Sequence, residues 1–136
     1  MPNHNFRNII AWQKGRKLVV DVYTLTNKFP QSEIYSLTSQ IKKAVVSITS
    51  NIAEGSGRGS DIDFSRFLDM AMGSAKEVES QLINAIDLGF VSENEIEHIK
   101  KDLIDVQNLI YGLQKSLKKN STNFKSFFFF LTSLVS

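Results

Sequence analysis

Apolar residues recur at three- and four-residue spacings in four successive segments of the chain, which is typical of amphipathic helices. We predict helices at about 8–29, 33–54, 61–88 and 93–119. No segment alternates apolar and polar residues in the way that a half-buried strand does. The sequence therefore predicts an all-α protein.

Each predicted helix has one apolar face that we expect to lie in the core. The four stripes are Leu18, Val22, Leu25 and Phe29; Leu37, Ile41, Ala44, Ile48 and Ile52; Phe64, Phe67, Leu68, Ala71, Ala75, Val78, Leu82 and Ala85; and Ile96, Ile99, Leu103, Val106, Ile110, Leu113 and Leu117. The fourth stripe alternates strictly by three and four residues, which is the heptad pattern of helices that pack side by side.

The residues at the segment boundaries favour the same helices. Pro30 ends the first helix, because proline disfavours helical geometry in the residue before it. Ser60 and Ser92 each precede an acidic residue by three positions, the spacing of a capping box at a helix start. Gly89 is typical of a left-handed helix end. Because the connections are short, we expect an antiparallel up-down-up-down four-helix bundle within residues 1–119.

The last residues, 120–136, lie outside this predicted bundle. Phenylalanine is frequent in 124–136, and Phe127 begins a run of four. The apolar run is shorter than the ~20 residues that span a bilayer. The tail can pack on the bundle, be buried between subunits, or form an extension that aggregates. We expect packing or disorder rather than a membrane function, and the sequence leaves the structure of the tail open.

A glycine-rich segment, GSGRGS, joins the second and third predicted helices. It is not a P-loop or a dinucleotide-binding loop, because both follow a strand and need other residues at fixed spacings. We therefore interpret Gly55, Gly57 and Gly59 as residues that supply positive φ angles for a tight turn. Arg58, beside the start of the third helix, remains a candidate anion contact.

The charge is unevenly distributed, although the net charge is only +2. Residues 1–58 contain eight basic and three acidic residues, whereas 59–112 contain four and eleven, and 113–136 add four lysines. An anionic partner is one explanation for such asymmetry. Head-to-tail contacts between subunits, or a solvated surface without a partner, explain it equally well.

Basic residues of the first half are the candidate contacts to RNA or DNA: Lys14, Arg16, Lys17, Lys42, Lys43 and Arg58. Contacts of such residues to phosphates are independent of sequence and sensitive to salt. A solvated helix face is the alternative explanation for the two adjacent lysines. Trp12 is a candidate for stacking on a base, or for an aromatic anchor between subunits.

A second polar group lies beside the core stripes of the second and third helices, and we expect it to form a hydrogen-bonded network. Its members are Ser47, Asn51, Glu54, Ser74 and Glu77. Carboxylates within a bundle can also hold two metal ions, but the Glu-x-x-His motifs of such sites are missing. No nucleophile is paired with a base. We therefore expect no enzymatic activity, no metal and no cofactor.

The chain contains no cysteine, which excludes disulfides and thiolate metal sites and fits a reducing compartment. The N-terminal residues lack the apolar core of a secretory signal. We therefore expect a cytoplasmic protein that does not contact a membrane.

Residues 9–117 contain a specific combination of residue types at fixed positions. Its members are Trp12, Tyr23, Phe29, Pro30, Glu33, Tyr35, Leu37, Gln40, Ser47, Ile48, Asn51, Ile52, Ala53, Glu54, Gly55, Arg58, Phe64, Phe67, Leu68, Gly73, Ser74 and Glu77. In this combination the chain resembles the four-helix-bundle proteins encoded in intervening sequences of bacterial 23S ribosomal RNA genes. The resemblance implies a bundle that assembles as a ring, with a homopentamer as the expected form, and without known enzymatic activity.

The resemblance also implies a relation to the accessory variability determinant protein of diversity-generating retroelements, a basic pentamer that binds nucleic acid and a reverse transcriptase. The present chain is only mildly basic. Two hypotheses therefore stand together. The protein is either a non-enzymatic oligomer that binds nucleic acid through basic helix faces, or a protein-binding or self-assembling scaffold.

Overall fold

The protein is a bundle of four helices in the computed structural model, which describes the backbone of 4–135 and the side chains of 4–120 and 130–134. Short 3-10 turns precede α1 and α2, and the described part contains no strand. The prediction of an all-α fold is confirmed. The helices are α1 (Ile10–Thr26), α2 (Leu37–Ser56), α3 (Asp61–Asp87) and α4 (Glu93–Val135).

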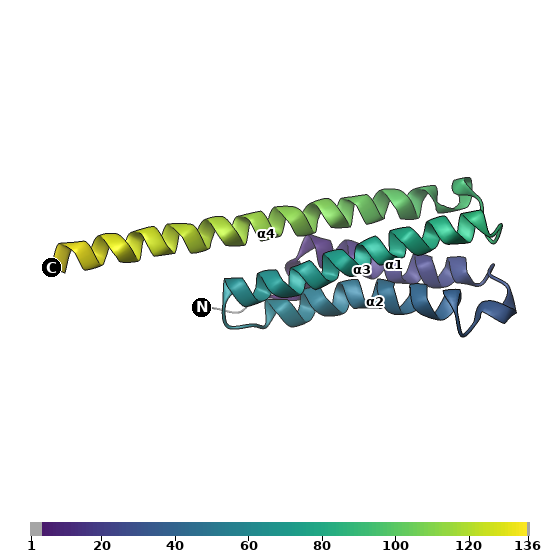
Figure 1. Cartoon of the computed structure of the whole chain (residues 1–136), viewed down its shortest axis with the longest axis horizontal. Coiled ribbons are helices and arrows are strands. Elements are labelled where there is room, and N and C mark those ends of the chain that lie inside the picture. The colour runs from purple at the N-terminus through teal and green to yellow at the C-terminus, as the bar shows by residue number, and fades with distance from the viewer. Residues whose placement is uncertain (1–3, 136) are drawn as a thin grey trace.

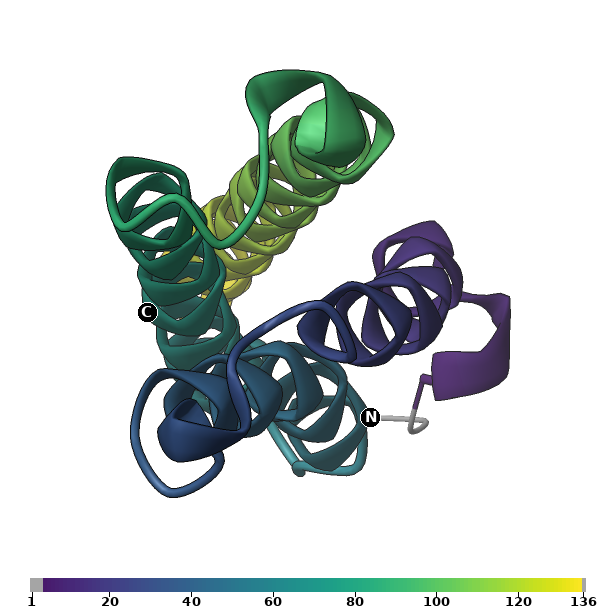
Figure 2. The same cartoon turned by 90° about the vertical axis from the view of Figure 1, so that its right-hand side faces the viewer.

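The helices pack in the predicted up-down-up-down order. Helix α1 packs against α2 and α4, and α3 packs against the same two helices (Figure 2). The predicted stripes meet in the interior, where Leu18, Ile48, Val78 and Val106 have no exposed surface. Burying each such side chain contributes about 1.5–3 kcal/mol to folding. The stripe pattern therefore identified the core of the bundle.

Helix α2 begins later than residue 33, where the sequence analysis placed its start. Residues Gln31–Glu33 form a separate 3-10 turn after Pro30. The Glu33 carboxylate then accepts hydrogen bonds from the Ser36 hydroxyl and from the backbone N–H of Leu37, the latter at 3.3 Å. Glu33 thus satisfies an N–H group that has no partner within the first turn of α2.

Helix α4 does not end at 119 but continues without interruption to Val135, so that its C-terminal part projects beyond the other three helices (Figure 1). The sequence after Gly112 contains neither glycine nor proline, the residues that most often end a helix. The part of α4 from 118 to 135 is called the α4 extension below.

The glycine-rich segment does not use positive φ angles, and that prediction is wrong. Among the described residues, only Gly89 has a positive φ, of 76°. Gly55 lies inside α2, where an added Cβ would stand 2.6 Å from Cβ of Phe67 and 2.9 Å from Cδ1 of Phe64. Gly55 therefore permits the close approach of α2 and α3 rather than a turn.

Candidate nucleic-acid interface

Two of the six predicted cations are engaged with α4. Nζ of Lys14 lies 3.3 Å from Oδ2 of Asp105, and Nζ of Lys17 lies 2.7 Å from Oδ2 of Asp102. The hydrogen bond to Asp102 raises the pKa of Lys17. Lys28 likewise pairs with Glu95. Lys14 and Lys17 thus connect α1 to α4, and Lys28 connects the turn after α1 to α4, so the charge of all three lysines is already balanced within the chain.

The two arginines among the six predicted cations, Arg16 and Arg58, lie against aromatic rings. The guanidinium of Arg58 donates a hydrogen bond of 3.1 Å to Oε1 of Glu54 and lies 4.5 Å from the centre of the Phe67 ring. Arg16 lies 5.8 Å from the Trp12 ring and forms no ion pair with a described residue. The carboxylate of Glu54 leaves Arg58 less available to an anion than Arg16.

Lys42 and Lys43 follow one another on the outer surface of α2. Nζ of Lys42 lies 4.7 Å from the centre of the Tyr23 ring, which belongs to α1. Lys43 is exposed, and neither lysine is paired with a carboxylate in the described part of the chain. These are the predicted cations that remain on an open surface of α2.

Both lysines line a groove of about 700 Å³ along α2, which we call the α2 groove. Its walls come from α1, from the connection before α2 and from α2 itself. They contain hydroxyl groups and aromatic rings but no carboxylate. The lining residues are Tyr23, Ile34, Tyr35, Thr38, Ser39, Lys42, Lys43, Val46, Ser47, Ser50 and Asn51.

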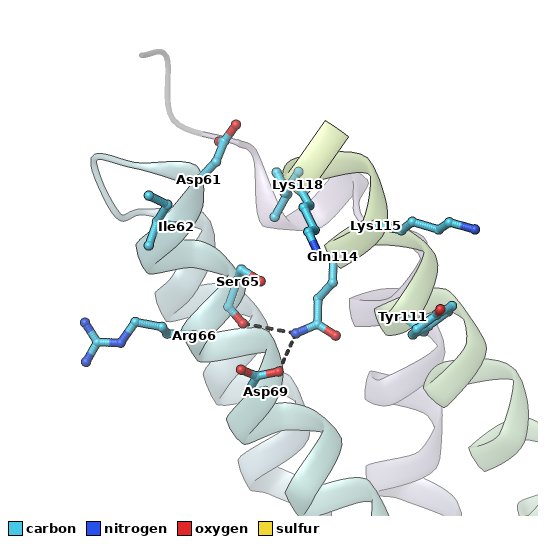
Figure 3. Close-up of a pocket in the computed structure, with 10 residues that line it drawn as sticks. Asp61, Ile62, Ser65, Arg66, Asp69, Tyr111, Gln114, Lys115 and Lys118 are labelled. Carbon is cyan, nitrogen blue, oxygen red and sulfur yellow. Dashed lines mark hydrogen bonds between the residues drawn. The ribbon is translucent and has the colours of Figure 1, made fainter. Parts of the chain in front are cut away.

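A groove between the start of α3 and α4 differs from the α2 groove in charge (Figure 3). Asp61 and Asp69 share its lining with Arg66 and two lysines of α4. The side chain of Gln114 reaches from α4 to α3. Its Nε2 donates hydrogen bonds to the Ser65 carbonyl at 3.1 Å and to Oδ1 of Asp69 at 2.6 Å. A third groove, on the outer face of α4, also mixes carboxylates with lysines. Of these three grooves, the α2 groove alone carries only positive charge.

The predicted polar network forms in part, at the edge of the α2 groove. Oγ of Ser74 donates to Oγ of Ser47 at 2.8 Å, and Nδ2 of Asn51 donates to both the hydroxyl and the carbonyl oxygen of Ser47. Glu54 turns instead to its salt bridge with the arginine one turn away. Glu77 forms no hydrogen bond or ion pair with the described residues. The network therefore joins α2 to α3 through three residues.

The aromatic residues of the α2 groove are not among the site residues predicted from the sequence. Tyr35 is 93% exposed and Ile34 is 48% exposed, both in the connection before α2. The sequence feature that could have identified them is the pair Ile34 and Tyr35, a large ring beside an apolar residue in a short and otherwise polar connection. Such exposed apolar groups in a groove are typical of binding surfaces.

Two further expectations concern metals and membranes. Within the part of the chain that the structure describes, no three His, Asp or Glu side chains are close enough together to bind a metal ion. In the same part of the chain, no helix has the length and hydropathy needed to span a bilayer.

Comparison with known proteins identifies the family. A family model described as 23S rRNA-intervening sequence protein matches residues 7–112. A crystal structure of a protein with unknown function from the S23 ribosomal protein family of Bacteroides thetaiotaomicron VPI-5482 is similar in fold, with a TM-score of 0.69 and 23% identity. The alignment covers 77% of this chain and 98% of that chain. No curated protein matches. The model covers most of the bundle, and the chain therefore belongs to the 23S rRNA-intervening sequence protein family.

Proposed function

We propose that the protein is a non-enzymatic, oligomeric accessory factor that binds nucleic acid through the α2 groove. The observation that supports this function is the charge of that groove, which holds Lys42 and Lys43 and no carboxylate. The family is named for an intervening sequence of 23S rRNA, which makes RNA the first nucleic acid to test.

The groove offers a separate chemical group to each part of a nucleotide. The two ammonium groups are donors for phosphate oxygens, and Ser39 and Ser50 add hydroxyl donors. The exposed ring of Tyr35 is available to a base, and such stacking contributes about 1–3 kcal/mol per base. We therefore expect the groove to prefer unpaired nucleotides, whose bases can reach the ring.

The internal salt bridges limit the number of phosphate contacts in one subunit. Lys14, Lys17 and Arg58 already face carboxylates, so Lys42 and Lys43 supply the main contacts and Arg16 an additional one. Few contacts give weak binding by a single subunit. A ring such as the expected homopentamer would repeat the groove on each subunit and raise the overall affinity through multivalency.

Fluorescence anisotropy with a labelled single-stranded RNA tests the proposal. Lys42→Glu with Lys43→Glu should weaken binding by about tenfold or more, because two phosphate contacts become repulsive. Lys100→Glu with Lys101→Glu is the matched control, since this exposed pair lies in a groove of mixed charge on α4. The control should bind RNA as the wild type does.

The salt dependence provides a second measurement. Two contacts to a single strand predict that the logarithm of the affinity falls with the logarithm of the salt concentration with a slope of about −1.4 per subunit. No RNA binding at low salt, or an equal loss in both double variants, would reject the α2 groove as the nucleic-acid interface.

The exposed rings also favour the second hypothesis, a protein-binding or self-assembling scaffold. The rings of Tyr35 and Tyr23 are 93% and 41% exposed, and the neighbouring aliphatic Ile34 is 48% exposed. Aromatic residues are enriched at protein interfaces. Under this alternative, Tyr35→Ser should change the oligomeric mass measured by light scattering while the wild type fails to bind RNA. Under the nucleic-acid proposal, the same variant weakens RNA binding at unchanged mass.

A further inference from the structure

The α4 extension carries exposed apolar side chains. Leu117 is 3% exposed and is packed against the bundle, whereas Phe130, Leu131 and Leu134 are 59%, 43% and 67% exposed. The helix runs past the ends of α1, α2 and α3, so these three helices do not accompany its tip (Figure 1). The extension thus presents apolar surface that the bundle leaves uncovered.

The heptad pattern of α4 continues into this extension. The alternation by three and four that runs from Ile96 to Leu117 goes on without a phase change to the last turn of the helix. We call these continuing positions the C-terminal seam. They are Asn120, Phe124, Phe127, Leu131 and Leu134. Four of the five are apolar, which is the pattern of a helix that packs along a second helix.

We infer that the C-terminal seam is an interface between two copies of this chain, in which two α4 extensions pack against each other in antiparallel orientation. A second copy fits because it carries the same apolar seam. In the heptad pattern of the sequence, Lys118, Lys119 and Lys125 all fall at positions outside the seam and its two flanking heptad positions. The seam and its flanking positions, which face the partner helix in a coiled coil, therefore contain no lysine.

The orientation follows from the position of the bundle. The apolar stripe of α4 faces α1 and α3 as far as Leu117, and the seam continues that same side of the helix. A parallel partner helix would run along this side into the space of the bundle. An antiparallel partner leaves in the other direction, and its own bundle then lies beyond the tip of the first extension. The antiparallel arrangement is the one that both bundles permit.

The end of the bundle supplies further surface to the partner. The start of α3, with Asp61 and Ile62, lies beside Lys118 at the base of the extension (Figure 3). Ile62 is 61% exposed, and Tyr111 of the same groove is 63% exposed. In the antiparallel pair, the tip of one extension, with Leu134, approaches this groove of the other copy.

Multi-angle light scattering of the full chain tests the interface. Leu131→Glu with Leu134→Glu should reduce the mass to about half of the wild-type mass, because an antiparallel contact joins copies, or rings of copies, in pairs. The matched control is Thr132→Glu with Ser133→Glu, which adds the same charge to the same turn away from the seam. The control should keep the wild-type mass. Equal masses for the wild type and the seam variant, or half the mass in both variants, would overturn the inference.

Single cysteines test the orientation, because the chain contains none of its own. Chains with Asn120→Cys should form an interchain disulfide when mixed with chains that carry Leu134→Cys, and neither variant should do so alone. Disulfides within each single variant would indicate a parallel pair and contradict the antiparallel interface. The absence of any interchain disulfide would overturn the inference as well. Neither measurement involves the α2 groove. A negative result for the C-terminal seam therefore leaves the proposed RNA binding to be decided by the anisotropy experiment.

Discussion

At the contact between α2 and α3, one residue determines how closely the two helices approach. A Cβ atom at Gly55 would collide with the side chains of Phe64 and Phe67 of α3. The sequence indicated that a glycine is needed at this position, but its reason could not be read from the sequence. The reason depends on which face of α3 meets α2, and that is a property of the packed pair.

Gly55→Ala should lower the free energy of unfolding by about 1–3 kcal/mol, because the added methyl group overpacks the contact. Gly112→Ala is the matched control, since Gly112 is also helical but has open space where a Cβ would stand. That variant should be more stable than the wild type by about 0.5–1 kcal/mol. Urea unfolding followed by circular dichroism measures both. A Gly55→Ala protein as stable as the wild type would show that the helices can separate without cost.

At the scale of elements, the ion pairs between α1 and α4 explain part of the uneven charge. Lys17 and Asp102 are 85 residues apart in sequence but lie on neighbouring helices. The excess of positive charge in the first half and of negative charge in 59–112 is therefore partly complementarity within the fold. The start of α4 at residue 93 was predicted correctly. The partners in the ion pairs could not be predicted, because they depend on α1 and α4 packing side by side.

Replacing Lys14 and Lys17 by glutamate should lower the urea midpoint, because both would then face the carboxylates of Asp102 and Asp105. Adding Asp102→Lys and Asp105→Lys should restore part of the midpoint, since these pairs are re-formed with opposite polarity while Asp21, which also pairs with Lys17, is unchanged. The recovery in the fourfold variant separates pairing from general effects of charge. If the fourfold variant were no more stable than the double variant, the pairs would not connect the helices.

The pH dependence of stability tests the pair at the start of α4. Hydrogen bonds from Lys28 and from Ser92 hold the pKa of Glu95 below its ordinary value. This carboxylate therefore contributes stability above the pKa of the unfolded chain, about 4.3, and the contribution is lost as the pH falls through the lowered pKa of the folded state.

Glu95→Gln should unfold at lower urea concentration than the wild type at neutral pH, and the difference should vanish in acid. Glutamine also suits the capping box, so this variant removes the charge and retains the cap. Glu97→Gln is the control, because Glu97 forms no ion pair or hydrogen bond with the described residues. A difference between Glu95→Gln and the wild type that did not depend on pH would contradict this assignment.

For the whole molecule, the sequence predicted the helical class, the number of helices and the core. It predicted the candidate site less completely. It identified Lys42 and Lys43, but it also selected Lys14, Lys17 and Arg58, which form salt bridges within the chain. The groove around the two lysines arises where α1, a connection and α2 meet, so its walls depend on the assembled bundle. Tyr23 belongs to α1 and Tyr35 to the connection before α2, so their position beside the two lysines follows only from the packing of these elements.

The boundary between the bundle and the projecting end of α4 has a consequence for how relatives can diverge. The family model ends at residue 112, and Leu117 is the last described core residue. The residues after Leu117 can be lengthened, changed in charge or deleted during evolution without altering the core of the bundle. Proteins that share this bundle can thus acquire different modes of association through a single appended stretch of helix.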